Sequence, residues 1–224
     1  MPATFAELFA RHVGSATARQ LALGDLLGER SWAVDIGRGT ATFDELTFPI
    51  QLLGTEAAGD DSWLWAWANE ASSLPETILR SAHHLRAVGQ KQGPELLATR
   101  GSSLDGMSGH EVAIVCTGLL GTGPYYRGPY DGGALFFTIE NVTLPDVDSV
   151  RISTVLTQVI SSFAVDHRIA SRSFLLDLGY MIDENASQMH GLKTSAPTVC
   201  FDFDAAGRLS NLAVSIAATS GAPR

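Results

Sequence analysis

The chain has 224 residues, of which 45% are hydrophobic and 17% charged, so it is long enough to bury a sizeable core. Lysine and arginine total 15 against 24 aspartate and glutamate residues, a formal net charge of −9, which excludes nucleic acid as an expected partner because phosphate binding needs a concentrated positive field. The longest apolar run, 112–120, is about half of what a membrane span requires.

The first segment is typical of an amphipathic helix. Thr4 and Glu7 form a capping box, and apolar residues recur at helical spacing as far as Leu27, with Gly24 or Gly28 to end the helix. The segment carries an acidic residue and therefore lacks the character of a secretory signal.

Alternating apolar and polar residues predict four strands after this helix, which indicates an antiparallel meander. A tight turn at 37–39 joins the first two strands into a hairpin, and Pro49 confines the third to an edge or to its first residues. The four strands are expected at residues 31–36, 40–43, 48–52 and 62–69.

The fourth predicted strand carries three of the four tryptophans. Because strand side chains alternate with period two, Trp63, Trp65 and Trp67 are expected to share one face, which we call the aromatic wall. The wall is either core beneath the N-terminal helix or a recognition surface with polar residues at its rim. On the second hypothesis the ligand-binding residues are Trp63, Trp65, Trp67, Glu56, Tyr126 and Arg127.

Two further capping boxes predict helices in the middle of the chain. Ser73 and Glu76 open one that ends at Gly89, and Ser108 with Glu111 opens a nearly apolar, buried one. A short turn at 95–99 lies between them, and strands at 125–127 and 134–141 follow, joined by a turn at 130–133.

The last third of the chain predicts two helices, a short strand, a loop and a closing hairpin. The helices are expected at 150–163 and 167–178, the short strand at 179–182 and the loop at 183–196. The hairpin is formed by strands at 199–203 and 209–216. A candidate boundary lies at 144–149, but it is too short for a flexible linker. We therefore predict one α+β domain over residues 1–224, an antiparallel sheet covered by helices.

No cofactor or metal motif is complete. Residues 37–39 and 121–123 each begin like the dinucleotide-binding motif G-x-G-x-x-G, but both lack its third glycine. His110-Glu111 begins like a zinc-protease helix, but the second histidine is missing because position 114 is isoleucine. His83 and His84 point about 100° apart on a helix and cannot converge on one ion. The sequence therefore predicts neither cofactor nor metal.

Several pieces of the chain resemble an uncharacterised bacterial family, a domain of unknown function. The most specific piece is Gln51-Leu52-Leu53-Gly54-Thr55-Glu56 followed by Ser62-Trp63-Leu64-Trp65-Ala66-Trp67-Ala68-Asn69. Other matching pieces occur at 32–35, 125–129 and 203–209, so the resemblance spans most of 19–216. It implies a shared fold and carries over no catalytic residue.

The function predicted from these features is a binding or interaction module with a small-molecule or protein ligand, and a homodimer is one assembly that the sequence leaves open. A hydrolase using Asp166 and His167, or His110 and Glu111, is the alternative from another class. A third is an acidic immunity-type protein that binds a basic partner. Because Cys116 and Cys200 form no C-x-x-C pair, reduced thiols and a cytoplasmic location are expected.

Overall fold

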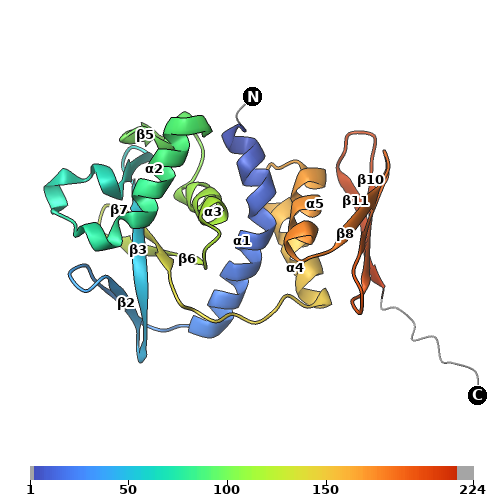
Figure 1. Ribbon diagram of the computed structural model, residues 1–224, viewed down its shortest axis with the longest axis horizontal. Coiled ribbons are helices and arrows are strands. Elements are labelled where there is room, and N and C mark those ends of the chain that lie inside the picture. The colour runs from blue at the N-terminus through green and yellow to red at the C-terminus, as the bar shows by residue number, and fades with distance from the viewer. Residues whose placement is uncertain (1–2, 216–224) are drawn as a thin grey trace, which may run out of the picture. The chain divides into compact units, whose positions relative to one another are not determined.

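A computed structural model describes residues 3–215 (Figure 1). The described part contains five α-helices and two antiparallel sheets, which confirms the predicted α+β class. It divides into two compact units, the first formed by 3–9 and 19–145 and the second by 10–18 and 146–215. The division after Pro145 falls within the candidate boundary, and one continuous helix contributes residues to both units. That the whole chain folds as one domain stays a prediction.

That helix is α1 (Phe5–Leu27), and its sequence signals act as expected. The Thr4 hydroxyl accepts from the Glu7 amide while the Glu7 carboxylate accepts from the Thr4 amide, which completes the capping box. Gly28 ends the helix with a positive φ of 54°, a conformation that glycine adopts without a steric penalty.

Seven strands form the sheet of the first unit. Strands β1 to β4 lie side by side in chain order, as the predicted meander of four strands requires, β5 follows β4, and β7 pairs with both β3 and β6. The strands are β1 (Trp32–Asp35), β2 (Thr40–Phe43), β3 (Leu46–Ala57), β4 (Ser62–Trp65), β5 (Gly101–Ser103), β6 (Tyr125–Tyr130) and β7 (Gly133–Ile139).

Strand β3 is much longer than predicted because it has different neighbours along its length. Its first four residues pair with β2, and from Ile50 onward it pairs with β7. Pro49 lies just before the first β3–β7 pair, where its carbonyl accepts from the Glu140 amide.

The prediction of one strand over 62–69 is wrong. Strand β4 stops at Trp65, and the chain turns into the 3₁₀ helix η1 (Ala66–Ala68), followed by η2 (Glu70–Ser72) and η3 (Glu76–Ile78). The predicted Ser73 capping box is also wrong, because Ser73 is left-handed (φ 45°) and ends η2.

Two helices of the first unit pack against its sheet (Figure 1). Helix α2 (Arg80–Gln92) begins later than predicted and continues through Gly89, while α3 (Gly109–Leu120) has the predicted bounds, capping box and Gly121 end. The predicted turn at 95–99 contains the 3₁₀ helix η4 (Glu95–Leu97). Strand β5 has no counterpart in the sequence prediction.

The second unit is a four-stranded sheet with helices α4 and α5 packed against it (Figure 1). The predicted loop over 183–196 is wrong, because it contains strand β9, which pairs with the strands on both sides. The last predicted hairpin is present, and its residue Ile216 lies outside the described residues. The elements are α4 (Ser149–Ser162), α5 (His167–Asp177), β8 (Met181–Glu184), β9 (Gln188–Leu192), β10 (Thr198–Phe203) and β11 (Leu209–Ser215).

Candidate functional site

Two of the three tryptophans of the aromatic wall lie in the core of the first unit. Trp63 is 1% exposed and Trp65 is 0% exposed, and their rings meet edge to face at 5.5 Å between centroids. Trp63 also lies 5.3 Å from the ring of Phe136 on β7. The Trp65 indole N–H donates to the Leu96 carbonyl at 2.8 Å. These two side chains therefore pack the sheet and present no surface to a ligand.

Trp67 lies apart from the other two because η1 breaks the strand alternation. Its half-buried ring packs against the core on the opposite face of the sheet, with residues such as Phe43 and Phe137. The guanidinium carbon of Arg86 lies 4.2 Å from the centroid of its ring, a cation–π contact. The predicted wall of three indoles on one face is therefore wrong.

Tyr126 and Arg127, predicted together at the rim, point to opposite faces of β6. Tyr126 is opposite Phe137 and packs on Trp32 and Phe43, with ring centroids 5.7 Å and 4.8 Å away. Arg127 is opposite Phe136 and therefore lies on the face that carries the buried tryptophans. Tyr126 therefore packs against the core, and only Arg127 lies on the same face of the sheet as Trp63 and Trp65.

Glu56 and Arg127 do come together, at the N-terminus of α3. Both strands that carry them flank β7, and the Glu56 Oε2 lies 3.5 Å from the Arg127 Nε. The other carboxylate oxygen accepts from the Gly109 amide at 2.7 Å. Glu56 is largely buried, with 16% of its side chain exposed. A carboxylate at this helix end is favourable because the unpaired amides and the helix dipole attract negative charge.

The approach of α3 to the sheet is close enough to require glycine at its first position. A Cβ on Gly109 would lie 2.6 Å from the Phe136 ring and 3.2 Å from the Glu56 carboxyl carbon. The missing side chain lets the helix start rest on the aromatic face, which brings the next residue, His110, over the same edge of the sheet.

His110 is the titratable group at the centre of this cluster. Its Nδ1 lies 2.9 Å from the Tyr125 hydroxyl, and its ring meets Phe136 at 84° and 5.6 Å. Partial burial lowers the pKa of His110, the Arg127 cation lowers it further, and the carboxylates of Glu56 and Glu111 oppose both. Burial raises the pKa of Tyr125, so its hydroxyl keeps its proton and can donate it to Nδ1.

A pocket of about 500 Å³ lies on the other face of the same sheet. It is bordered by residues of β3, the η1–η2 segment, β6 and β7. Its apolar residues are Ile36, Leu52, Ala66, Leu74 and Leu135, and its polar side chains are Thr55, Asn69, Ser72 and Tyr130, with Gly54 contributing backbone. No sequence motif predicts this pocket, because it depends on the turn that η1 makes after Trp65.

In the second unit the predicted hydrolase pair, Asp166 and His167, has structural partners. The Asp166 carboxylate caps α5 by accepting from the Ile169 amide at 2.8 Å. The Nδ1 of His167 accepts from the Leu209 amide at 2.9 Å, which ties the helix start to β11. Both line a hollow of about 450 Å³ together with Arg168 and Arg208.

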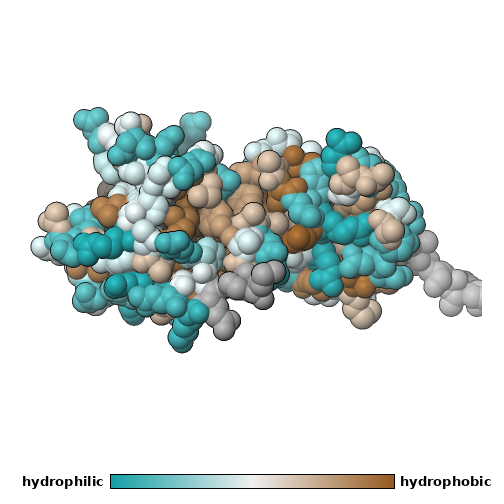
Figure 2. All heavy atoms as spheres, turned by 90° about the horizontal axis from the view of Figure 1, so that it is seen from above, coloured by the Kyte–Doolittle hydropathy of each residue, from teal (hydrophilic) through white to brown (hydrophobic). Residues whose placement is uncertain are grey.

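Over residues 3–215, no group of three or more histidine, cysteine, aspartate or glutamate side chains is arranged to hold a metal ion. Within the same residues, every helix is too short or too polar to cross a bilayer. Hydrophilic side chains cover much of the face shown in Figure 2, in keeping with the net charge of −9.

A model of a family described as Family of unknown function (DUF6882) matches residues 6–142, more than half of the chain. The chain belongs to this family. The expected membership of a family of unknown function is therefore confirmed. No curated protein and no solved structure matches the chain.

The DUF6882 match places the two candidate sites of the first unit in the part of the chain that the family shares. The Glu56–His110 cluster and every residue that lines the 500 Å³ pocket lie between residues 36 and 135. Asp166 and His167 lie beyond the matched residues. The two sites that the family match covers therefore both belong to the first unit.

Proposed function

We propose that the protein is a binding module that holds a small molecule in the pocket between β3 and the η1–η2 segment. The observation that carries this proposal is the pocket itself, whose volume of about 500 Å³ lies within the range of small-molecule sites. Its walls combine apolar side chains with a few convergent polar groups, the composition typical of such sites.

The lining indicates the chemistry of the ligand. None of the residues that line the pocket is charged, so an ionised ligand would lose its hydration without gaining an opposite charge. Thr55, Ser72 and Tyr130 supply hydroxyl groups, and the Asn69 side chain is oriented because its Oδ1 accepts from the Ser72 amide at 3.2 Å. The ligand is an uncharged molecule with an apolar body and hydroxyl or carbonyl groups at one edge.

The first experiment fills the pocket. Leu135 lines it from β7, so Leu135→Trp places an indole in the space that a ligand would occupy. Nile red, an uncharged dye that fluoresces in apolar surroundings, is the probe. The wild type is expected to bind it saturably and Leu135→Trp at least about tenfold more weakly, a loss of about 1.4 kcal/mol.

Leu176→Trp is the matched control, because Leu176 is 43% exposed on α5 in the second unit. This substitution should leave dye binding unchanged. Far-ultraviolet circular dichroism establishes that both variants are folded. Equal dye affinity in the wild type and in folded Leu135→Trp would contradict the proposal. Native mass spectrometry of freshly purified protein then searches for a retained molecule or a second copy of the chain.

A second candidate function, acid–base catalysis at His110, is favoured by one observation. His110, Tyr125, Glu56 and Arg127 converge at the start of α3, and the pKa of His110 is lowered, as expected for a general base at neutral pH. Glu111, its neighbour in the predicted pair, is occupied by the capping box, where its carboxylate accepts from Ser108.

Hydrolysis of the activated ester p-nitrophenyl acetate tests this candidate. A catalytic His110 predicts that His110→Gln lowers the rate at least about a hundredfold, the usual contribution of a positioned acid or base. His84→Gln, on the exposed surface of α2, is the control. Equal rates in the two variants would exclude His110 from this chemistry.

A further inference from the structure

The open face of the second sheet carries a row of three chemically active side chains. Asp183 on β8 is directly opposite His190 on β9, and His190 is directly opposite Cys200 on β10. Residues opposite each other in antiparallel strands share a face, with Cβ atoms about 5 Å apart. The sheet thus places an acid, an imidazole and a thiol side by side, and we call these three residues the Cys200 row.

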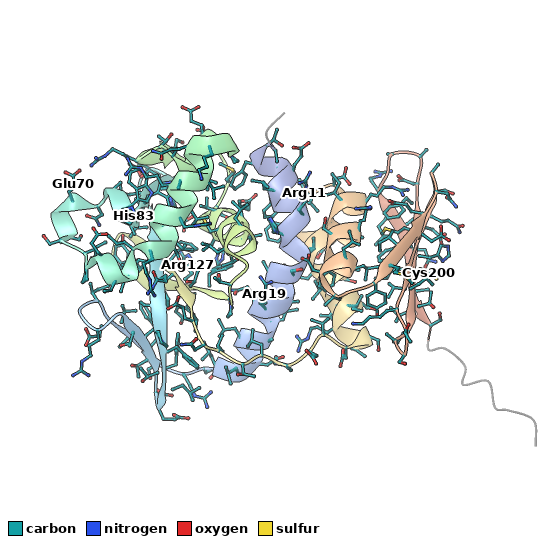
Figure 3. The ribbon with its side chains drawn as sticks, viewed as in Figure 1. Arg11, Arg19, Glu70, His83, Arg127 and Cys200 are labelled. Atoms are coloured by element: carbon teal, nitrogen blue, oxygen red, sulfur yellow. The ribbon has the colours of Figure 1, made fainter. Side chains whose placement is uncertain are left out.

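The thiol and the imidazole are in contact. The Cys200 Sγ lies 3.4 Å from the His190 Nδ1, within reach of a hydrogen bond to sulfur. Both residues are partly exposed, whereas the neighbours of Cys200 along β10, Val199 and Phe201, are buried on the other face. The contact therefore lies on the partly exposed face of the sheet, opposite to the face of Val199 and Phe201. Figure 3 labels Cys200 on this sheet.

The second cysteine provides an internal contrast. Cys116 lies in α3, is 0% exposed, and burial raises its pKa strongly. A thiol that is shielded from solvent and resists deprotonation reacts slowly, because the thiolate is the nucleophile. Any thiol reactivity of the folded chain must therefore come from Cys200.

We propose that Cys200 is a modification site that forms mixed disulfides with small disulfide molecules, with His190 as its base. A nucleophile in contact with a base, and an acid next to that base, is the arrangement that activates cysteine in enzymes. Cys200 and His190 are only partly exposed, so the site suits a small reagent. This site lies in the second unit and is independent of the proposed pocket ligand.

The exchange reaction is balanced with the disulfide as its only oxidant. The thiol proton moves to the His190 Nδ1 as the Cys200 sulfur attacks one sulfur of the disulfide. A new S–S bond forms, the original S–S bond breaks, and the leaving thiolate departs and takes up a proton from the imidazolium or from water. Two carboxylates stabilise the imidazolium by their charge and act as positioning residues: Asp183, opposite His190 on β8, and Asp202 on β10, whose charge interacts with that of His190.

The test uses 4,4′-dithiodipyridine, a disulfide that is uncharged at neutral pH and releases a chromophore on exchange. One equivalent should be released rapidly from the folded wild type and a second only after denaturation. Cys200→Ser should abolish the rapid phase, and Cys116→Ser should retain it. Mass spectrometry should find one added pyridylthio group, on Cys200.

The role of His190 is tested with His190→Asn, which removes the base while keeping a polar side chain. We expect the rapid phase to slow at least about tenfold, a modest share of what a positioned base contributes. Asp183→Asn should slow it less, and His84→Asn, on α2, should leave it unchanged. His190→Gln is a second variant in case the first alters folding, which urea unfolding detects.

Three results would overturn the proposal. A folded wild type without a rapid phase would show that Cys200 is unreactive. A rapid phase that survives in Cys200→Ser would assign the reactivity to Cys116. A rate in folded His190→Asn or His190→Gln within a factor of about two of the wild-type rate would show that exposure of the thiol alone explains it.

Discussion

The two sheets differ in how many of their faces are covered. On β7 the adjacent residues Phe136 and Phe137 are both 0% exposed, so the first sheet is buried on both faces. On β10, Val199 and Phe201 are buried while Cys200 between them is partly exposed, so the second sheet has one open face. On β7 an aromatic side chain is therefore core whichever way it points. In the second sheet, the direction of a side chain decides whether it is core or available for chemistry.

The largest expected effect tests the covered sheet. Trp65→Ala removes a fully buried indole and its hydrogen bond to Leu96, and should lower the free energy of unfolding by about 3–5 kcal/mol in urea titrations. His190→Ala, on the open face of the second sheet, should change it by less than about 0.5 kcal/mol. If Trp65→Ala kept wild-type stability, and acrylamide quenched the wild-type indoles, Trp63 and Trp65 would be surface residues and not core.

The next effect concerns how closely α3 approaches the covered sheet. Gly109→Ala would place a Cβ 2.6 Å from the Phe136 ring, and should cost about 1–3 kcal/mol of stability through overpacking. Gly24→Ala is the matched control in helix α1, where a Cβ meets no atom within 4 Å, and should stabilise by about 0.5–1 kcal/mol. Thermal or urea unfolding of both variants measures the difference. Equal changes would mean that α3 lies farther from the sheet.

These contrasts show which parts of the fold the sequence could predict. The capping boxes at Thr4 and Ser108 were predicted correctly because each is formed by residues three apart in the chain. The box at Ser73 failed although its residue types are suitable, because Ser73 adopts a left-handed conformation after η2. Strand β9 was missed since its inward position Gly191 has no side chain, and Leu175 of α5 occupies that space instead.

The candidate site depended even more on distant residues. Glu56 and Arg127 were both selected from the sequence, but their meeting at α3 follows from the pairing of β3 and β6 with β7. Tyr126 was wrongly grouped with Arg127, an error that strand alternation alone could have prevented. The pocket and the Cys200–His190 contact were missed because they arise from a chain reversal at η1 and from the register of β9.

A smaller effect is expected from removing the Glu56 charge at the N-terminus of α3. Glu56→Gln keeps an acceptor for the Gly109 amide but removes the charge next to Arg127 and the helix start, and should cost about 1 kcal/mol, less at high salt. Glu45→Gln is the control, because Glu45 forms an exposed ion pair with Arg30 and should change stability by less than about 0.5 kcal/mol. Urea titrations at low and high salt measure both. An effect of Glu56→Gln that does not depend on salt would argue against an electrostatic role.

The smallest effect is a pH dependence at the same corner of the first sheet. Burial and Arg127 lower the pKa of His110 from 6.5, so the unfolded chain takes up a proton at higher pH than the folded chain does. Stability is therefore complete above about pH 6.5 and declines as the pH falls toward the lowered pKa, because the unfolded state then binds more protons. Urea titrations between about pH 7 and pH 5 should show a shallower decline in His110→Gln than in the wild type.

Two variants sharpen this result. His84→Gln, on the exposed surface of α2, should keep the wild-type decline. Glu56→Gln removes a carboxylate that raises the pKa of His110, so it should lower that pKa further and extend the decline to lower pH. Direct titration of the His110 ring by NMR in the wild type and in Glu56→Gln measures the same shift without unfolding. An identical decline in the wild type and His110→Gln would place the His110 ring in solvent. The first sheet would then be open where His110 lies, as the second sheet is open at Cys200.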